Sequence, residues 1–164
     1  MMNNKMHGLE DKSQLEMYTK AKKSALGLLA MREHSAQELK CKLAERGFDT
    51  NTIAQILVDI GKSGLQSDER FAEFYVKSRI DRGYGPLRIE AELRERGIAQ
   101  SLIREFLDKN SEIWRTSAEK VYQKKFGKLP LTAANQDEKL KRLHFLQYRG
   151  FGMEQLKGIK ELGK

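Results

Sequence analysis

The basic side chains of one glycine-rich segment are the residues of this sequence best suited to bind a charged partner. Residues 82–88 read Arg-Gly-Tyr-Gly-Pro-Leu-Arg, with an arginine at each end. Two glycines and a proline are typical of a loop, and the planar guanidinium group binds carboxylates and phosphates through paired hydrogen bonds. The segment therefore predicts a loop that contacts an anionic partner. An inert connection is the alternative, but it would need less arginine.

Basic residues are unevenly distributed along the chain. Residues 1–66 hold 10 basic and 8 acidic residues, residues 67–110 hold 9 of each, and residues 111–164 hold 12 and 6. Seven of the nine basic residues in the middle segment are arginines. Pairs on a solvated helix, such as Glu90 and Arg94, account for part of this charge. They leave the net charge of +8 unexplained, and that charge fits nucleic acid or an acidic protein surface.

No combination of residues in the sequence predicts catalysis or metal binding. Residues 61–63 (Gly-Lys-Ser) resemble the end of a phosphate-binding loop, but Ile56 stands where that motif needs glycine, so we interpret them as a helix end. The single cysteine, Cys41, excludes a disulfide within the chain and lacks the partners of a nucleophile. We expect no enzyme activity, no metal and no cofactor. The three histidines lack the spacing of metal ligands: His7, His34 and His144.

Length and composition narrow the class of protein. The chain has 164 residues, of which 33% are charged, 39% are hydrophobic and only two are proline. These values argue against a β-sandwich, a collagen-like chain and a disordered tail. The longest apolar stretch, residues 25–31, is much shorter than the ~20 residues of a membrane span. Since the polar N-terminus also has no signal-peptide core, we expect a cytoplasmic protein with no membrane partner.

A threefold repeat predicts the elements that position the basic residues. Similar six-residue segments, each containing Arg-Gly followed by an apolar residue, occur at 43–48, 93–98 and 146–151. Apolar residues recur six and nine positions after each glycine, and the shared register covers about 35 residues. Apolar side chains three and four apart upstream of each segment favour a helix. Each repeat therefore predicts three helices.

Helix start and stop signals divide each repeat. Ser35 to Glu38 has the form of a capping box, and Pro86 suits the first position of a helix. The Arg-Gly pair predicts the end of each second helix, because glycine adopts the left-handed conformation and arginine offsets the helix dipole. In the third repeat, a loop at 130–132 and a cap at 135–138 precede the second helix. We expect the third helices at 51–62, 100–109 and 152–160.

These signals predict an all-α fold, an elongated, curved solenoid of three tandem three-helix repeats with about nine helices and no sheet. Its predicted parts are a flexible N-terminal arm at 1–15 and repeats at 16–66, 67–110 and 111–164. We interpret four aromatic residues as packing contacts rather than base-stacking groups: Trp114, Tyr122, Phe126 and Phe145.

One set of positions across the first two repeats matches a known family. These positions are residues 25–30, Arg32, Ser35, Glu38-Leu39, Leu43, Gly47-Phe48, residues 68–72, Tyr75, Arg79, residues 83–86, Arg88-Ile89, Leu93 and Gly97-Ile98. At these positions the sequence resembles the RecX family, regulators of the RecA recombinase. The resemblance covers about 21–162 and is most specific in the middle repeat.

The resemblance implies a regulator without an active site that lies in the groove of a RecA–single-stranded DNA filament. Such a regulator inhibits filament extension, ATP hydrolysis, strand exchange and coprotease activity, within DNA repair, homologous recombination and the SOS response.

A curved repeat that bridges neighbouring RecA protomers would resist the rearrangements that growth and ATP turnover require. Basic side chains would meet DNA phosphates or acidic recombinase surfaces, with an affinity that falls as salt rises. Arginine at helix ends, including Arg96 and Arg149, has a competing structural role. The candidate partner-binding residues are Arg79, Arg82, Tyr84, Arg88, Arg96, Lys124, Lys125, Lys141, Arg142 and Arg149.

Two other functions stay open. A stand-alone basic DNA-binding helical module would place a helix in the major groove, but the predicted third helices are not consistently basic. A solenoid that binds only protein would use its charge for solubility alone. We expect a monomer whose direct binding to free nucleic acid is weaker than its binding to the filament.

Overall fold

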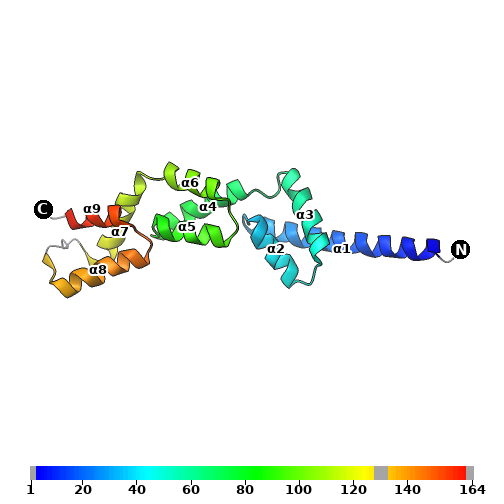
Figure 1. Ribbon diagram of the computed structural model, residues 1–164, viewed down its shortest axis with the longest axis horizontal. Coiled ribbons are helices and arrows are strands. Elements are labelled where there is room, and N and C mark those ends of the chain that lie inside the picture. The colour runs from blue at the N-terminus through cyan, green and yellow to red at the C-terminus, as the bar shows by residue number, and fades with distance from the viewer. Residues whose placement is uncertain (1–2, 128–132, 162–164) are drawn as a thin grey trace. The chain divides into compact units, whose positions relative to one another are not determined.

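The computed structural model describes the backbone of residues 3–127 and 133–161 (Figure 1). Within these residues the chain forms nine α-helices and no strand, which confirms the predicted all-α class. None of these helices combines the length and the apolar character needed to cross a bilayer. The helices are α1 (Asn3–Met31), α2 (Ala36–Glu45), α3 (Thr50–Lys62), α4 (Asp68–Asp81), α5 (Pro86–Glu95), α6 (Gln100–Lys109), α7 (Ile113–Phe126), α8 (Gln136–Tyr148) and α9 (Met153–Glu161).

The chain divides into two compact units, Met1–Phe71 and Ala72–Lys164. Unit 1 contains α1 to α3 and the first turn of α4, and unit 2 contains the rest of α4 and α5 to α9. Each unit is described separately below. The boundaries of the arm and the three repeats, and the elongated, curved arrangement of the repeats, stay predictions.

Helices α1, α2 and α3 bury one continuous core in unit 1. Ile53, Ile56 and Ile60 recur three and four residues apart on α3, so their side chains share one face and lie in this core. The hydroxyl of Tyr18 on α1 donates a 2.6 Å hydrogen bond to Oδ2 of Asp59 on α3. The other buried side chains of the core are Ala21, Ala25, Leu28, Leu39 and Leu43.

The N-terminal segment differs from its expected form. We expected an arm over residues 1–15, but α1 begins at Asn3, so residues 3–15 are helical. These residues include no proline and several strong helix formers, such as Lys12 and Leu15. Their polar character, which suggested an arm, instead belongs to a helix whose side chains at residues 11–17 are exposed. Whether this part of the chain is flexible stays a prediction.

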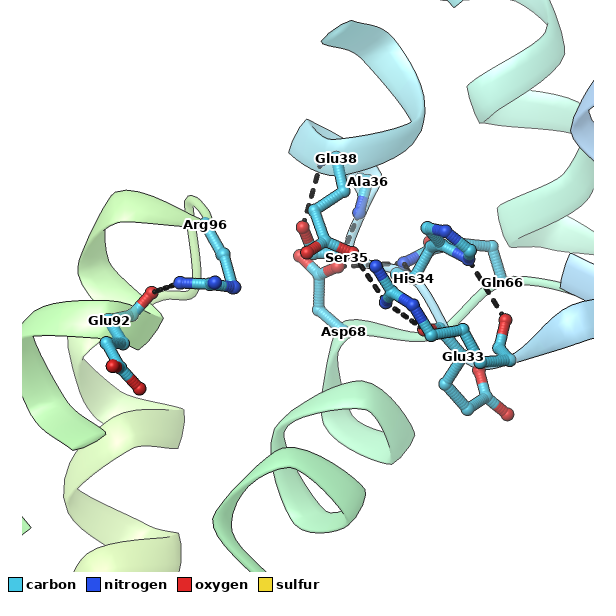
Figure 2. Close-up of polar contacts among 10 residues, drawn as sticks. Glu33, His34, Ser35, Ala36, Glu38, Gln66, Asp68, Glu92 and Arg96 are labelled. Atoms are coloured by element: carbon cyan, nitrogen blue, oxygen red, sulfur yellow. Dashed lines mark hydrogen bonds and ion pairs between the residues drawn. The ribbon is translucent and has the colours of Figure 1, made fainter. Parts of the chain in front are cut away.

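A buried polar cluster at the α1–α2 connection holds the start of α4 within unit 1 (Figure 2). Ser35 caps α2, and its hydroxyl accepts a hydrogen bond from the backbone N–H of Glu38, as the capping box predicts. The carboxylate of Asp68 accepts hydrogen bonds from the backbone N–H of Ala36 at 2.9 Å and from Nε2 of Gln66 at 2.8 Å. Gln66 also donates to the carbonyl of His34. These buried polar groups therefore satisfy one another.

The three Arg-Gly pairs end helices α2, α5 and α8 in the same way. The arginine is the C-cap residue in each case, and the following glycine has φ of +85° (Gly47), +74° (Gly97) or +92° (Gly150). The N–H of the next residue then bonds to a carbonyl five residues back, at 3.1 to 3.2 Å. This is the Schellman pattern, and its threefold occurrence confirms the predicted helix ends. Helix α3 likewise ends at Lys62, with Ser63 as its cap.

Helices α7, α8 and α9 share a second core, in unit 2. Its buried side chains include Tyr122, Leu146 and Phe151, while Phe126 and Phe145 are partly buried. Trp114 is also buried, and its indole N–H donates to the carbonyl of Leu107 at 3.3 Å. The four aromatic residues interpreted as packing contacts therefore do pack. The Asn135 cap of α8 is confirmed, and the loop expected at 130–132 lies outside the described residues.

Candidate functional site

The α4–α5 loop and the α8–α9 loop of unit 2 are joined through their backbones. The N–H of Gly85 donates to the carbonyl of Arg149 at 2.8 Å, and the N–H of Leu87 donates to the carbonyl of Gly150 at 3.1 Å. A Cβ at Gly85 would lie 2.6 Å from the backbone nitrogen of Phe151. The close approach of the two loops therefore requires glycine at this position.

The contact between the α4–α5 loop and the α8–α9 loop is called the joint from here on. Tyr84 lies at its centre, among three arginines. The guanidinium carbons of Arg79, Arg88 and Arg149 lie 4.9, 4.4 and 5.2 Å from its ring centroid. These distances are within the range of cation–π attraction. Nη1 of Arg149 also donates to the carbonyl of Arg82 at 3.1 Å. Three of the predicted basic residues thus contact one predicted tyrosine, although they come from three different helices or helix ends.

Glu92 neutralises part of this arginine cluster. Its carboxylate accepts hydrogen bonds from Nε of Arg79 at 2.6 Å, Nε of Arg88 at 3.0 Å and the hydroxyl of Tyr75 at 2.9 Å. Burial opposes ionisation, but the hydrogen bonds from Arg88, Tyr75 and Arg79 outweigh it, so the pKa of Glu92 lies below its ordinary value. Arg79 and Arg88 are therefore partly committed to holding the fold together.

An open groove of about 610 Å³ lies beside the joint, in unit 2. It is bounded by the end of α4, the α4–α5 loop, α7 and the end of α8. Its apolar lining comes from Ile80, Ile113, Val121 and Phe145. Its charged lining consists of five basic residues and one acidic residue: Arg82, Lys120, Lys124, Lys125, Arg149 and Asp81.

Seven of the ten predicted binding residues lie in the joint or in the lining of the groove. Arg79, Tyr84 and Arg88 belong to the joint, Arg82, Lys124 and Lys125 line the groove, and Arg149 does both. Both places lie within unit 2, so the sequence patterns at 79–88 and 124–149 describe neighbouring features of one unit.

The other three predicted residues lie elsewhere. Arg96 caps α5 and donates to the carbonyl of Glu92 at 2.7 Å, as Figure 2 shows, and its guanidinium lies over the ring of Tyr75. Arg142 on α8 binds Glu138 and the hydroxyl of Tyr122. Lys141 is exposed on α8 and is not part of the groove lining. These contacts support the structural interpretation for Arg96 and Arg142.

Sequence reasoning missed three residues at these places. Lys120 lines the groove, Glu92 holds the arginines, and Tyr148 is exposed with the guanidinium of Arg88 5.5 Å from its ring. Lys120 could have been found, because it stands four residues before Lys124 on one helix face. Glu92 has the same signal toward Arg88, four residues before it on α5, but its contacts with Arg79 and Tyr75 come from α4. Tyr148 carries no comparable signal, because Arg88 reaches it from another part of the chain.

No group of three or more histidine, cysteine, aspartate or glutamate side chains in the described parts of the chain could hold a metal ion. His34 is buried at the α1–α2 connection, and Cys41 is exposed on α2. The groove of unit 2 is lined by both charged and apolar side chains.

Comparison with known proteins identifies the family. Family models for the first, second and third three-helix domains of RecX match residues 21–58, 67–107 and 116–157. Together these matches span most of the chain. The chain belongs to the RecX family. The three matches also confirm the predicted fold of three tandem three-helix repeats.

RecX proteins of known sequence and structure agree with this assignment. The chain is 42% identical to the regulatory protein RecX of Halorhodospira halophila over 134 residues, which cover 82% of each protein. It is 43% identical to the regulatory protein RecX of Legionella pneumophila, over 81% of this chain and 87% of the relative. These relatives are named as regulatory proteins.

Two solved RecX structures share the fold. The crystal structure of RecX from Lactobacillus salivarius superposes with a TM-score of 0.75 at 20% identity and covers 88% of this chain and 95% of that one. A crystal structure of a regulatory protein RecX superposes with a TM-score of 0.80 at 22% identity, over 98% of this chain and 80% of that one. At these identities the RecX structures support the fold alone.

Proposed function

We propose that this protein is a non-enzymatic regulator that binds in the groove of the RecA–single-stranded DNA filament. It bridges neighbouring RecA protomers and inhibits filament extension, ATP hydrolysis, strand exchange and coprotease activity. Membership of the RecX family supports the choice of partner. The observation that carries the proposal is the basic groove beside the α4–α5 loop, whose lining includes five basic side chains and one acidic side chain.

Charge supports binding to an anionic assembly. Unit 2 holds 20 basic and 13 acidic residues, a net charge of +7, whereas unit 1 holds 11 and 10, a net charge of +1. A filament that carries DNA phosphates is strongly anionic, so electrostatic attraction accelerates association and weakens as salt rises. Bridging then opposes the relative motion of RecA protomers that ATP turnover requires. We also propose that the regulator is a cytoplasmic monomer.

A stand-alone DNA-binding module is the alternative, and no specific observation favours it. Such a module needs a basic helix that enters the major groove. Helix α6, the third helix of the middle repeat, carries only Arg104 and Lys109 as basic residues, and two acidic residues lie between them. Measuring RecA ATPase inhibition beside binding to naked DNA separates this alternative from the proposal.

The test is the ATPase rate of RecA on single-stranded DNA, with this protein added below the stoichiometry of the filament, beside its binding to naked DNA. We expect inhibition at low ratios together with weak binding to naked DNA. Tight DNA binding, with ATPase loss only when the DNA is saturated, would refute the proposal and support the DNA-binding module.

Charge reversal at Arg82 tests the surface. Arg82 is exposed, and its backbone carbonyl rather than its side chain takes part in the joint. We expect Arg82→Glu to raise the concentration for half-maximal inhibition about tenfold, because it replaces attraction by repulsion at the groove rim. Arg88 is less suitable, since it pairs with Glu92. The control is Lys40→Glu, an equal change of charge at an exposed position of α2. This variant should inhibit as the unmodified protein does.

A further inference from the structure

The groove of unit 2 differs from a simple basic patch because its lining includes four apolar side chains, which we call its floor, while its exposed basic side chains are called its rim. Ile80, Ile113, Val121 and Phe145 contribute apolar side chains to it, and Ile113 remains 39% exposed. Gly83 lies directly against Val121, because a Cβ on Gly83 would come within 2.7 Å of the Val121 Cγ2 atom. The α4–α5 loop therefore forms one wall of the groove and α7 forms another.

Three basic side chains of the groove have no ion pair among the residues that the structure describes. Arg82, Lys120 and Lys124 are exposed, and the ion pairs among the described residues use other basic side chains. Lys120 and Lys124 are four residues apart on α7, about 6 Å along the axis. Carboxylates one helical turn apart on a partner would match this spacing.

The ring of Phe145, the aromatic residue in the groove lining, already has packing partners. Phe145 packs edge-on against Phe126 at 5.4 Å, and the charged groups of Arg149 and Lys125 lie 5.4 and 5.9 Å from its ring centroid. Proteins that bind single strands offer open aromatic faces on which bases stack. The groove instead offers aliphatic side chains, which phosphates and sugars do not match. Its lining therefore favours a protein segment over a nucleic-acid strand.

We infer that this groove binds an acidic, amphipathic protein segment, with aliphatic side chains of the segment on the floor and its carboxylates against Arg82, Lys120 and Lys124. Burial of aliphatic groups inside a charged rim is the usual anatomy of a specific protein interface. The groove volume of about 610 Å³ is enough for a few side chains. The inference rests on the proposed function, since it assigns the segment to the recombinase side of the filament rather than to the DNA.

Two kinds of variant separate the contributions of charge and apolar surface. Lys120→Glu combined with Lys124→Glu reverses the rim, and Ile113→Ser removes apolar surface at the first turn of α7 without changing charge. Matched controls lie on exposed positions of unit 1: Lys12→Glu combined with Lys40→Glu, and Val58→Ser. Circular dichroism and thermal unfolding establish that each variant is folded, and Lys120→Gln combined with Lys124→Gln replaces the charge reversal if that variant unfolds.

Binding is measured to two probes, the assembled RecA–single-stranded DNA filament and a fluorescent oligothymidine. We expect the rim variant and Ile113→Ser each to weaken filament binding about tenfold, while Ile113→Ser changes oligothymidine binding less than twofold. The unit 1 controls should bind the filament as the unmodified protein does.

Two results would overturn the inference while leaving the proposed function intact. One is filament binding by Ile113→Ser that equals that of the unmodified protein. The other is a rim variant whose affinities for the filament and for oligothymidine fall in the same proportion, which would mean that the rim binds phosphates. Failure of the unmodified protein to bind the filament would refute the proposed function and the inference together.

Discussion

The connections between the first and second helices of two repeats differ in what holds them in place. In unit 1, residues 32–35 are fastened by buried polar side chains, with Ser35 as a cap and Gln66 and Asp68 as partners (Figure 2). In unit 2, residues 82–85 are fastened by backbone hydrogen bonds to the α8–α9 loop and by arginines around Tyr84.

The difference shows that the same three-helix pattern can hold its first connection in two ways, through side chains or through the backbone. The polar groups at the unit 1 connection form hydrogen bonds with one another. Unit 1 also has a net charge of only +1. In unit 2 backbone hydrogen bonds close the joint, and Arg82, Lys120 and Lys124 are exposed beside it. The predictions below test this contrast, from the largest expected effect to the smallest.

Gly150→Ala should break the joint of unit 2. Gly150 has φ of +92°, and a Cβ there would lie 2.6 Å from the backbone nitrogen of Arg88. Left-handed strain and overpacking together should lower the free energy of unfolding by about 2–5 kcal/mol. Denaturant unfolding followed by fluorescence of the single tryptophan, Trp114 in unit 2, measures the loss.

Gly47→Ala in unit 1 is the matched control for this prediction. Gly47 has a similar φ of +85° but no atom within 4 Å of an added Cβ, so only the backbone strain of about 1–2 kcal/mol applies. Equal losses in the two variants would contradict the idea that loop contact makes the unit 2 joint special.

Ser35→Ala should weaken unit 1 more than the equivalent change weakens unit 2. Ser35 is fully buried, and its hydroxyl caps α2, so its loss leaves the partly buried N–H of Glu38 without its acceptor and should cost about 1–2 kcal/mol. Asn135→Ala removes an exposed cap of α8 and should cost about 0.5–1 kcal/mol. Hydrogen exchange read by mass spectrometry assigns each loss to its unit, and the reverse order would contradict the prediction.

Acidification should destabilise unit 1 at a higher pH than unit 2. Burial lowers the pKa of His34 below 6.5, so the stability that neutral His34 provides is present above pH 6.5 and is lost as pH falls through the lowered value. The pKa of Glu92 lies below 4.5, since the hydrogen bonds from Arg88, Tyr75 and Arg79 outweigh its burial, so its contribution is lost only in more acid solution.

Hydrogen exchange of the unmodified protein at pH 7, 5.5 and 4 follows the two units separately. His34→Gln should flatten the pH dependence of unit 1 between pH 7 and 5.5, and Glu92→Gln should flatten that of unit 2 below pH 4.5. A unit 2 that loses protection first would contradict the assignment of these two groups.

Much of the fold was predictable because its signals are local. Capping residues such as Ser35 and Asn135, Pro86 at a helix start and the Arg-Gly helix ends each depend on a few neighbouring residues. The helical state of residues 3–15 was missed because polar composition alone does not distinguish an exposed helix from an arm.

The site was predictable only in part, because its geometry depends on residues far apart in sequence. The basic character of Arg82 and Arg149 was evident, but their meeting through Tyr84 and the paired glycines depends on how two loops pack. The structural role of Arg79 and Arg88 depends on Glu92. The Arg88–Glu92 pair is four residues apart on α5 and has a local signal, whereas the Arg79–Glu92 pair joins two helices and has none. The groove beside them was likewise invisible, since its apolar floor comes from three helices.

The joint of unit 2 also has a consequence for how the chain is made. Arg82 and Arg149, which meet there, are separated by 67 residues. At a synthesis rate of roughly 5–20 residues per second, the α8–α9 loop is synthesised on the order of 3 to 13 seconds after the α4–α5 loop that it contacts. The helices of unit 1 precede Arg149 in the chain, so the joint of unit 2 and the groove beside it can form only after unit 1 has been synthesised.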